Sequence, residues 1–309
     1  MTEYAITTTN LVKQFSKKRA VDGISLTIKK GEIYGILGPN GAGKTTFLRM
    51  LATLSPITEG HASIFGYDVA KEADQIRRMI GLTGQYATVD EELTAMENLL
   101  IFGQLNGLGK SGAKQRATEL LTQFSLFDAK DRAIKEFSGG MRRRLDLAVS
   151  LITKPPLIFL DEPTTGLDPI TRGEMWDVIR QLVKDGSTIL LTTQYLEEAD
   201  QLADRIAIIN HGKLVTEGTA NELKAQLGET YFDIQLSDIH QIDDAAEFLQ
   251  TKVEERVIRM PDRGTLALKI SDTKKMTKLL VDLEDKHIEV KEFAVRKPTL
   301  DEVFLEITK

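Results

Sequence analysis

One stretch near the N-terminus decides the fold of this chain: Gly38-Pro39-Asn40-Gly41-Ala42-Gly43-Lys44-Thr45-Thr46 (GPNGAGKTT). It fits the pattern G-x-x-x-x-G-K-[ST], and it lies between an apolar run, EIYGIL at 32–37, and a helix-like run, TTFLRMLATL at 45–54. Glycines allow backbone N–H groups to curve around phosphate oxygens, and a helix N-terminus adds its partial positive charge. The stretch therefore predicts a phosphate-binding loop that joins a strand to a helix.

The loop also supplies side chains with distinct roles. We expect Lys44 to reach the β- and γ-phosphates of a bound nucleotide and the Thr45 hydroxyl to ligate Mg²⁺, with Thr46 beside them. The alternative is an unrelated glycine turn. Because glycine makes up about 7% of residues, a chance match in a chain of this length is roughly a one-in-a-hundred event. The strand before the loop and the helix after it favour the phosphate-binding interpretation.

A second apolar run, LIFL at 157–160, ends in the carboxylates Asp161 and Glu162. In open α/β sheets, ligands bind at the carboxyl ends of the strands. We therefore predict that Asp161 holds Mg²⁺ and that Glu162 polarises the attacking water as general base. An isolated strand ending in Asp-Glu favours a helix-capping role, so the prediction depends on the phosphate loop.

Two further segments carry possible phosphate contacts. Ser138, Gly139 and Gly140, which we name the signature segment, come directly before a helix-like run and predict either a second phosphate-binding surface or an ordinary N-cap. Since the chain already has a phosphate loop, the signature segment is predicted to serve a nucleotide held by another chain. Gln194 follows the strand-like run TILLTT at 188–193 and opens an acidic helix. Arg142–Arg144 are predicted to be solvated or paired with acidic residues.

Length, charge and the spacing of apolar residues limit the possible architectures. The 309 residues suffice for more than one domain, and the absence of cysteine excludes disulfides and a cysteine nucleophile. Lys+Arg 40 against Asp+Glu 46 shows no basic bias, so nucleic acid is not expected as a partner. No apolar run approaches the roughly 20 residues that span a bilayer, and the N-terminus lacks signal-peptide features. These observations predict a cytoplasmic protein, and docking onto a membrane protein stays open.

Alternating strand-like and helix-like runs predict an α/β fold with a parallel sheet. The order of such runs after about residue 227 is βαββαβ, which predicts a small α+β, ferredoxin-like domain. We therefore expect an N-terminal domain over 1–227, with a helical subdomain at about 86–155, and an accessory domain over 228–309. AIIN-HGKLVTEG, at 207–218, predicts a hairpin with its turn at Asn210-His211-Gly212.

Four stretches occur together in one order: GPNGAGKTT at 38–46, FSGGMRRRLDLA at 137–148, LIFLDEPTTGLDP at 157–169 and TTQYLEEAD at 192–200. Over about residues 4–220 they resemble the ATP-binding subunit of an ABC transporter. The resemblance implies a P-loop NTPase fold, a RecA-like core with β-rich and helical subdomains. It also implies that two copies sandwich two ATP molecules, each between one chain's phosphate loop and the other's signature segment.

The resemblance assigns further residues. Gln85 matches the loop that senses the γ-phosphate, ligates Mg²⁺ and faces the membrane subunit. Asp168 matches the loop that crosses the dimer interface, although a helix-entry turn also explains it. Phe15 matches the aromatic that stacks on adenine, and a hairpin core position is the alternative. Gln194 occupies the γ-phosphate sensor position, where most of the family has histidine.

The segments GQYATVDEELT, TTQYLEEADQLADRIAIIN and RKPTLDEVFLEI resemble the daunorubicin-resistance branch of drug exporters, which often carries glutamine at the sensor position. This implies an ATPase at the cytoplasmic face of the cell membrane, bound to a separate multi-span permease. Rival interpretations are a soluble ATPase acting on ribosomes or DNA and a non-hydrolysing, ATP-gated module. The single cassette disfavours the first, and intact Lys44, Asp161 and Glu162 disfavour the second. A drug, a lipid and a polysaccharide all stay open as substrate, and the accessory domain could stabilise or regulate the dimer.

Overall fold

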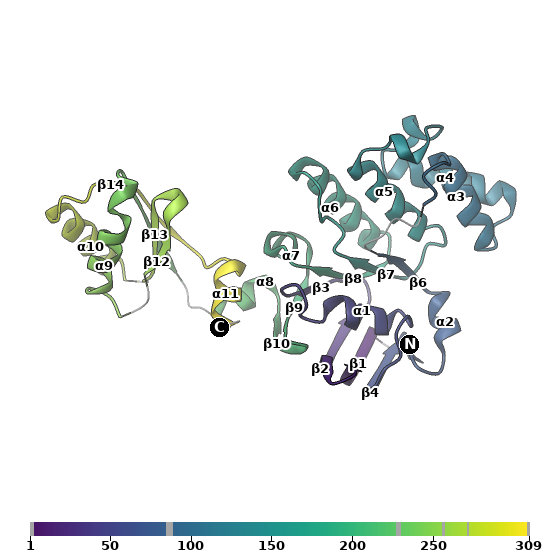
Figure 1. The fold of residues 1–309 in the computed structure, drawn as a ribbon, viewed down its shortest axis with the longest axis horizontal. Coiled ribbons are helices and arrows are strands. Elements are labelled where there is room, and N and C mark those ends of the chain that lie inside the picture. The colour runs from purple at the N-terminus through teal and green to yellow at the C-terminus, as the bar shows by residue number, and fades with distance from the viewer. Residues whose placement is uncertain (1–2, 85–88, 227–229, 255–256, 271, 308–309) are drawn as a thin grey trace. The chain divides into compact units, whose positions relative to one another are not determined.

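The structure is a computed structural model that describes residues 3–84, 89–226, 230–254, 257–270 and 272–307 (Figure 1). The chain divides into two compact units, Met1–Ala220 and Asn221–Lys309. The division falls near the predicted boundary at 227/228, and helix α8 (Ala220–Ala225) begins at the junction. Each unit is described separately below.

The first unit contains two sheets. The smaller, antiparallel sheet has the order β2 (Lys18–Lys29), β1 (Tyr4–Phe15), β4 (Glu59–Ile64) and β5 (Tyr67–Asp68). The larger sheet has the order β10 (Lys213–Gly218), β9 (Arg205–Asn210), β3 (Ile33–Leu37), β8 (Thr188–Thr193), β7 (Leu157–Asp161) and β6 (Ile80–Thr83). Strands β9, β3, β8, β7 and β6 pair in parallel, which confirms the predicted parallel sheet.

The strands β3, β7 and β8 are buried along their whole length, which explains the unbroken apolar runs LIFL at 157–160 in β7 and ILL at 189–191 in β8. The β9–β10 hairpin turns at His211 and Gly212, whose φ values of 48° and 80° are those of a tight hairpin turn. The hairpin prediction is thus confirmed.

Helices cover both faces of the larger sheet (Figure 1). Helix α1 (Lys44–Leu51) lies between the two sheets, where Phe47 and Leu48 join a buried cluster with Ile6 and Ile24. The opposite face carries a second buried cluster, to which the helical subdomain contributes. The remaining helices of this unit are α2 (Ala73–Arg77), α3 (Ala95–Leu105), α4 (Lys110–Gln123), α5 (Gly139–Ser150), α6 (Pro169–Lys184) and α7 (Leu196–Leu202), with short 3₁₀ turns at Phe127–Ala129 and Ile134–Glu136.

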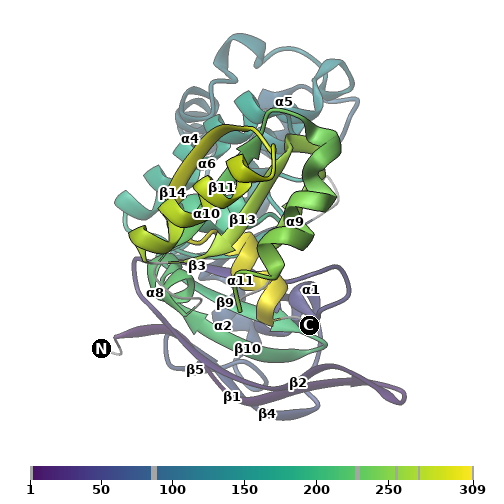
Figure 2. The same ribbon diagram turned by 90° about the vertical axis from the view of Figure 1, so that its left-hand side faces the viewer.

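The second unit is a four-stranded antiparallel sheet with the order β12 (Ile258–Met260), β13 (Thr265–Lys269), β11 (Tyr231–Leu236) and β14 (Val290–Arg296). Helices α9 (Ile242–Gln250) and α10 (Thr273–Asp285) lie on one side of it (Figure 2) and share its buried apolar cluster. Two 3₁₀ turns, Ile239–Gln241 and Pro261–Arg263, and helix α11 (Leu300–Ile307) complete the unit. The chain order βαββαβ and the central placing of β11 and β13 confirm the ferredoxin-like prediction.

Arg296, at the end of β14, fastens α11 to this sheet. Its guanidinium lies 2.6 Å from the Asp233 carboxylate on β11 and 2.7 Å from the Glu302 carboxylate on α11. Glu302 also accepts the backbone N–H of Thr299 at 2.8 Å. A partly buried ion-pair network therefore holds the stretch RKPTLDEVFLEI, which includes α11, against the sheet of the second unit.

Candidate functional site

Part of the predicted site gathers at the carboxyl edge of the larger sheet. Strand β8 lies between β3 and β7, so the phosphate loop, Gln194 and the Asp161–Glu162 pair follow three adjacent parallel strands. Strand β6 follows next to β7 and ends just before Gly84. Gln85, predicted to sense the γ-phosphate, lies outside the described residues.

The phosphate loop depends on glycine at two positions. Gly43 has φ 106° and is the N-cap of α1, and a Cβ placed there would lie 2.3 Å from the Ala20 carbonyl oxygen. A Cβ at Gly38 would lie 2.3 Å from the Ile209 carbonyl oxygen. Any larger residue would push the loop away from the neighbouring strands. The first N–H groups of α1 lack partners within the helix, which leaves donors for an anion at this end.

Lys44 is buried, with 5% of its surface exposed, and its side chain turns back into the loop. Its Nζ donates to the carbonyls of Gly38, at 2.8 Å, and Pro39, at 3.2 Å. The same Nζ lies 3.5 Å from Oε1 of Glu162. Burial lowers the pKa of Lys44, and the nearby carboxylates of Glu162 and Asp161 oppose that shift. The cation is thus held in place by groups on both sides.

Asp161 and Thr45 form an oxygen-rich pair beside Lys44. Thr45 Oγ1 donates to Asp161 Oδ1 at 3.1 Å, and Thr192 Oγ1 donates to the same oxygen at 2.5 Å. Asp161 has only 4% of its surface exposed. A hydroxyl and a carboxylate are hard oxygen donors of the kind that Mg²⁺ prefers, so these residues fit a magnesium site that retains waters.

Glu162 has a backbone conformation that is uncommon for a residue with a side chain. Its φ is 50°, in the left-handed region, which costs about 1–2 kcal/mol for an L-residue. Its N–H donates to the Thr192 carbonyl at 3.1 Å, and Oε2 accepts from Thr165 Oγ1 at 3.3 Å. The chain therefore leaves β7 by a sharp turn that aims the Glu162 carboxylate toward Lys44.

Gln194 directly follows β8, at the same edge, and is partly exposed. No hydrogen bond joins its side-chain amide to another part of the described chain. On the helix that follows, α7, Glu198 is fully buried and accepts from Thr164 Oγ1 at 2.7 Å and Trp176 Nε1 at 3.3 Å. Burial raises the pKa of Glu198, against the effect of hydrogen bonds from Thr193, Thr164 and Trp176.

The signature segment lies at the start of α5. Ser138 is the N-cap, and its Oγ accepts the Met141 N–H at 3.2 Å. Ser138 and Gly139 are exposed, so their surface is open to an approaching group. Asp168 likewise caps α6, accepting from Ile170 and Thr171 N–H groups at 3.0 Å. The local capping roles that sequence reasoning considered for these segments are present.

Phe15 lies at the end of β1 with 53% of its surface exposed, which excludes the hairpin core position considered as an alternative. The Nζ of Lys13 lies 5.0 Å from the centre of the Phe15 ring. Lys13 itself is buried and donates to the Pro56 carbonyl at 2.6 Å. An exposed, supported aromatic ring suits stacking on a flat ligand.

Arg143 makes contacts that were not predicted from the sequence. As predicted, Arg142 pairs with Glu91 at 2.6 Å and Arg144 pairs with Glu174 at 3.2 Å. The same prediction is wrong for Arg143, which is partly buried and donates only to backbone carbonyls in its hydrogen bonds to the described chain. Because every residue has a backbone carbonyl, the sequence does not indicate which carbonyls an arginine will bond.

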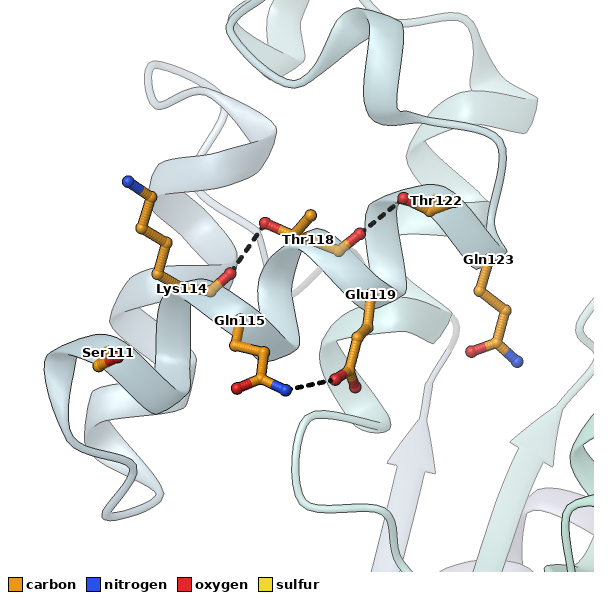
Figure 3. Close-up of a pocket in the computed structure, with 7 residues that line it drawn as sticks. All are labelled: Ser111, Lys114, Gln115, Thr118, Glu119, Thr122 and Gln123. Atoms are coloured by element: carbon orange, nitrogen blue, oxygen red, sulfur yellow. Dashed lines mark hydrogen bonds between the residues drawn. The ribbon is translucent and has the colours of Figure 1, made fainter.

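A groove on the helical subdomain lies apart from this chemistry. Its lining consists of seven residues of α4: Ser111, Lys114, Gln115, Thr118, Glu119, Thr122 and Gln123 (Figure 3). Thr118 and Thr122 donate their hydroxyls to carbonyls one turn back, and Gln115 donates to Glu119 at 3.2 Å. Because these polar groups bond within one helix, we assign no ligand to the groove.

Among the described helices, none is both long and apolar enough to cross a membrane.

Comparisons with known proteins agree with this geometry. Residues 21–165 match the ABC transporter family, and residues 218–308 match the C-terminal domain of DrrA1-3-like ATP-binding proteins. The chain is 50% identical over 304 residues to the daunorubicin/doxorubicin resistance ATP-binding protein DrrA of Streptomyces peucetius, covering 98% of this chain and 92% of that protein. It is 36% identical to the linearmycin resistance ATP-binding protein LnrL of Bacillus subtilis, with coverages of 97% and 96%.

Solved structures add the fold and the reaction. The dimeric ATP-binding cassette MJ0796, bound to ADP and Pi in a post-hydrolysis state, matches with a TM-score of 0.63 at 28% identity. The match covers 69% of this chain and 98% of that one. The P-loop NTPase fold and the ATPase activity predicted from the sequence are thereby confirmed. The chain belongs to the ATP-binding subunits of ABC transporters.

Proposed function

We propose that this ATPase powers an exporter, moving a hydrophobic or drug-like molecule through a separate membrane permease. The likeness to the daunorubicin/doxorubicin resistance protein extends over almost the whole chain and includes the C-terminal domain. That likeness is the observation that carries the exporter role, and the convergence of Lys44, Thr45, Asp161 and Glu162 at one sheet edge supports the ATPase role. An enzyme that hydrolyses ATP would need all four of these residues.

The phosphate loop, residues 38–46, would hold the ATP phosphates with its backbone N–H groups and the Lys44 ammonium. Phe15 would stack on the adenine. Thr45 and Asp161, together with Gln85, would hold Mg²⁺, Asp161 through water. The ion supplies charge neutralisation for the phosphate oxygens.

Hydrolysis would then depend on Glu162 and Gln194. Glu162 lies among buried groups where a carboxylate can accept a proton from the attacking water. Gln194, at the end of the neighbouring strand, would donate its amide N–H to a γ-phosphate oxygen. A neutral amide keeps this donor through the pH range in which histidine titrates.

We further propose that two copies form the working unit. The signature segment is exposed at the N-terminus of α5, where it can meet a phosphate held by another chain. Asp168 would cross the same interface. A Ser138→Arg chain should bind ATP but block closure, because a bulky cation would stand where the partner's γ-phosphate approaches.

Mixing Ser138→Arg with Lys44→Ala tests the shared sites. In a mixed dimer, one site has both lesions and the other has neither, so partial ATPase activity should return. The control is each variant assayed alone, where both sites of the homodimer are damaged. Proven mixed dimers without any recovery would count against sites shared between chains.

The exporter role places the protein at the cytoplasmic face of the cell membrane, held there by the permease. The decisive experiment is affinity purification from detergent-solubilised membranes, followed by identification of co-purifying proteins. We expect a multi-span membrane protein, retained equally by the Lys44→Ala variant, since docking precedes ATP use. Recovery of ribosomal proteins or DNA in place of a membrane protein would refute the exporter role.

A further inference from the structure

Arg143 makes an unusual set of contacts with the strand ends that carry the catalytic groups. Its guanidinium donates to the carbonyls of Asp161 at 3.0 Å, Glu162 at 2.9 Å and Pro163 at 2.9 Å. A fourth bond, at 2.7 Å, goes to the carbonyl of Gly84, just beyond the end of β6. One side chain on α5 therefore bonds three consecutive carbonyls, from the last residue of β7 onward, and one carbonyl just after β6.

These carbonyls surround the residue whose backbone is under strain. Glu162 has φ 50°, and a residue in such a conformation persists only when its surroundings hold it there. Its N–H side is held by Thr192, on β8, at 3.1 Å. Its carbonyl side is held by Arg143. Without the guanidinium, several partly buried carbonyls would lose charge-assisted hydrogen bonds, and the turn would be free to relax.

We propose that Arg143 is a positioning residue for the reaction: through the backbone, it fixes the direction in which the Glu162 carboxylate points. The inference rests on the proposed role of Glu162 as general base. The planar fork of arginine donates in several directions at once, which suits neighbouring carbonyls. Lysine is a point donor, so its ammonium would satisfy fewer of them. The signature segment begins the same helix, so a second possible effect of Arg143 is on the placing of Ser138.

The first test compares Arg143→Met and Arg143→Lys with a matched control, Arg116→Met. Arg116 is also partly buried, donates to the Leu151 carbonyl at the other end of α5 at 2.8 Å, and pairs with Glu119 at 3.1 Å. Both arginines therefore tie α5 to its surroundings, but only Arg143 reaches the catalytic turn. Melting temperature, ATP affinity, kcat and KM are measured for these three variants and for the parent.

We expect Arg143→Met and Arg116→Met to lower the melting temperature, while only Arg143→Met loses kcat. Because a misplacement of about 1 Å can cost about a hundredfold in rate, we expect kcat to fall roughly ten- to a hundredfold with ATP affinity little changed. Arg143→Lys should lie between Arg143→Met and the parent. If Arg143→Met does not fold, the kcat of Arg143→Lys relative to the parent tests the inference by itself. A kcat like that of the parent, or an equal loss in Arg116→Met, would overturn the inference.

Mixed dimers separate an effect on Glu162 from an effect on the signature segment. Paired with Lys44→Ala, an Arg143→Met chain contributes its own phosphate loop and Glu162 to the competent site. Paired with a Ser138→Arg chain, the Arg143→Met chain contributes to the competent site only its signature segment, while the phosphate loop and Glu162 of that site come from the Ser138→Arg chain. The references are the same pairings with Arg143 intact.

We expect slow turnover when Arg143→Met is paired with Lys44→Ala. When Arg143→Met is paired with Ser138→Arg, we expect turnover equal to that of its reference dimer. Equal or greater slowing in the second pairing would overturn the assignment to Glu162. If the reference dimers are inactive, the homodimer comparison decides. None of these assays needs a permease, so failure of the exporter proposal would leave the result intact.

Discussion

The ammonium of Lys44 and the carboxylate of Glu162 lie 3.5 Å apart, although the segments that carry them follow β3 and β7, two strands that are not neighbours in the sheet. Both side chains are buried, with 5% and 9% of their surfaces exposed. The carbonyls of Gly38 and Pro39 hold the other side of the ammonium. The proposed phosphate-binding cation and the proposed general base therefore hold each other in place.

Replacing Lys44 by alanine removes the cation that the phosphate loop supplies. A hydrogen bond to a charged group contributes about 1.5–3 kcal/mol, so Lys44→Ala should weaken ATP binding by roughly ten- to a hundredfold. Calorimetric titration with Mg-ATP measures this directly. Lys71→Ala is the control, since the Lys71 side chain is 82% exposed. Parent-like affinity in Lys44→Ala would remove the phosphate-loop assignment.

Glu162→Gln keeps the size of the side chain and removes its ability to accept a proton. ATP binding should persist, while hydrolysis slows by roughly a hundredfold or more, within the range that general base catalysis contributes. Size-exclusion chromatography with Mg-ATP should show a dimer that retains two ATP molecules. Glu197→Gln, which changes an exposed carboxylate on α7, should behave like the parent. A Glu162→Gln protein that stays monomeric with ATP would speak against the sandwich.

The strand order explains why so much of this site was predictable. In a parallel sheet all carboxyl ends meet at one edge, so residues 38–46, Asp161 and Gln194 had to converge once their strands were recognised. Arg143 and Glu198 were not predictable in the same way. Arg143 bonds carbonyls of distant segments, and Glu198 lies in an acidic stretch that looks solvated. Their partners come together only through packing of α5 and α7 on the sheet.

Glu198 gives a stability prediction with a definite sign. Its pKa in the folded protein is raised above the ordinary value of 4.5 by burial, so the folded state binds its proton more tightly than the unfolded state does. Stability from this group is therefore full below pH 4.5 and falls as pH rises through the raised pKa. Glutamine stays neutral throughout. The melting temperature of Glu198→Gln relative to the parent should therefore increase with pH over that window.

The control for this measurement is Glu302, whose pKa shifts the other way. Burial acts to raise it, but hydrogen bonds from Arg296 and Thr299 outweigh burial, and the pKa is lowered. Its stabilisation is present above pH 4.5 and is lost as pH falls, so Glu302→Gln should weaken the C-terminal unit at neutral pH. Equal pH trends for Glu198→Gln and Glu302→Gln would contradict the burial argument.

Gln194 directly follows β8, the strand that lies between β3, which leads into the phosphate loop, and β7, which ends at Asp161. If its amide N–H holds the phosphate in line with the attacking water, Gln194→Ala loses one hydrogen bond to a charged group. Such a bond contributes about 1.5–3 kcal/mol, so turnover should slow by roughly ten- to a hundredfold. An alternative is that the amide only fills space at the strand end, in which case alanine costs little.

Histidine at this position separates the two views. An imidazole N–H can reach a similar point, so Gln194→His should keep substantial activity. It should also acquire a pH dependence that the parent lacks, because the reference pKa of histidine is about 6.5 and a neighbouring phosphate raises it. Turnover of the parent, Gln194→Ala and Gln194→His is measured from about pH 6 to 8.5, the range that brackets this titration. An alanine variant as fast as the parent would rule out the sensor role, whereas slow alanine and active, pH-dependent histidine variants would establish it.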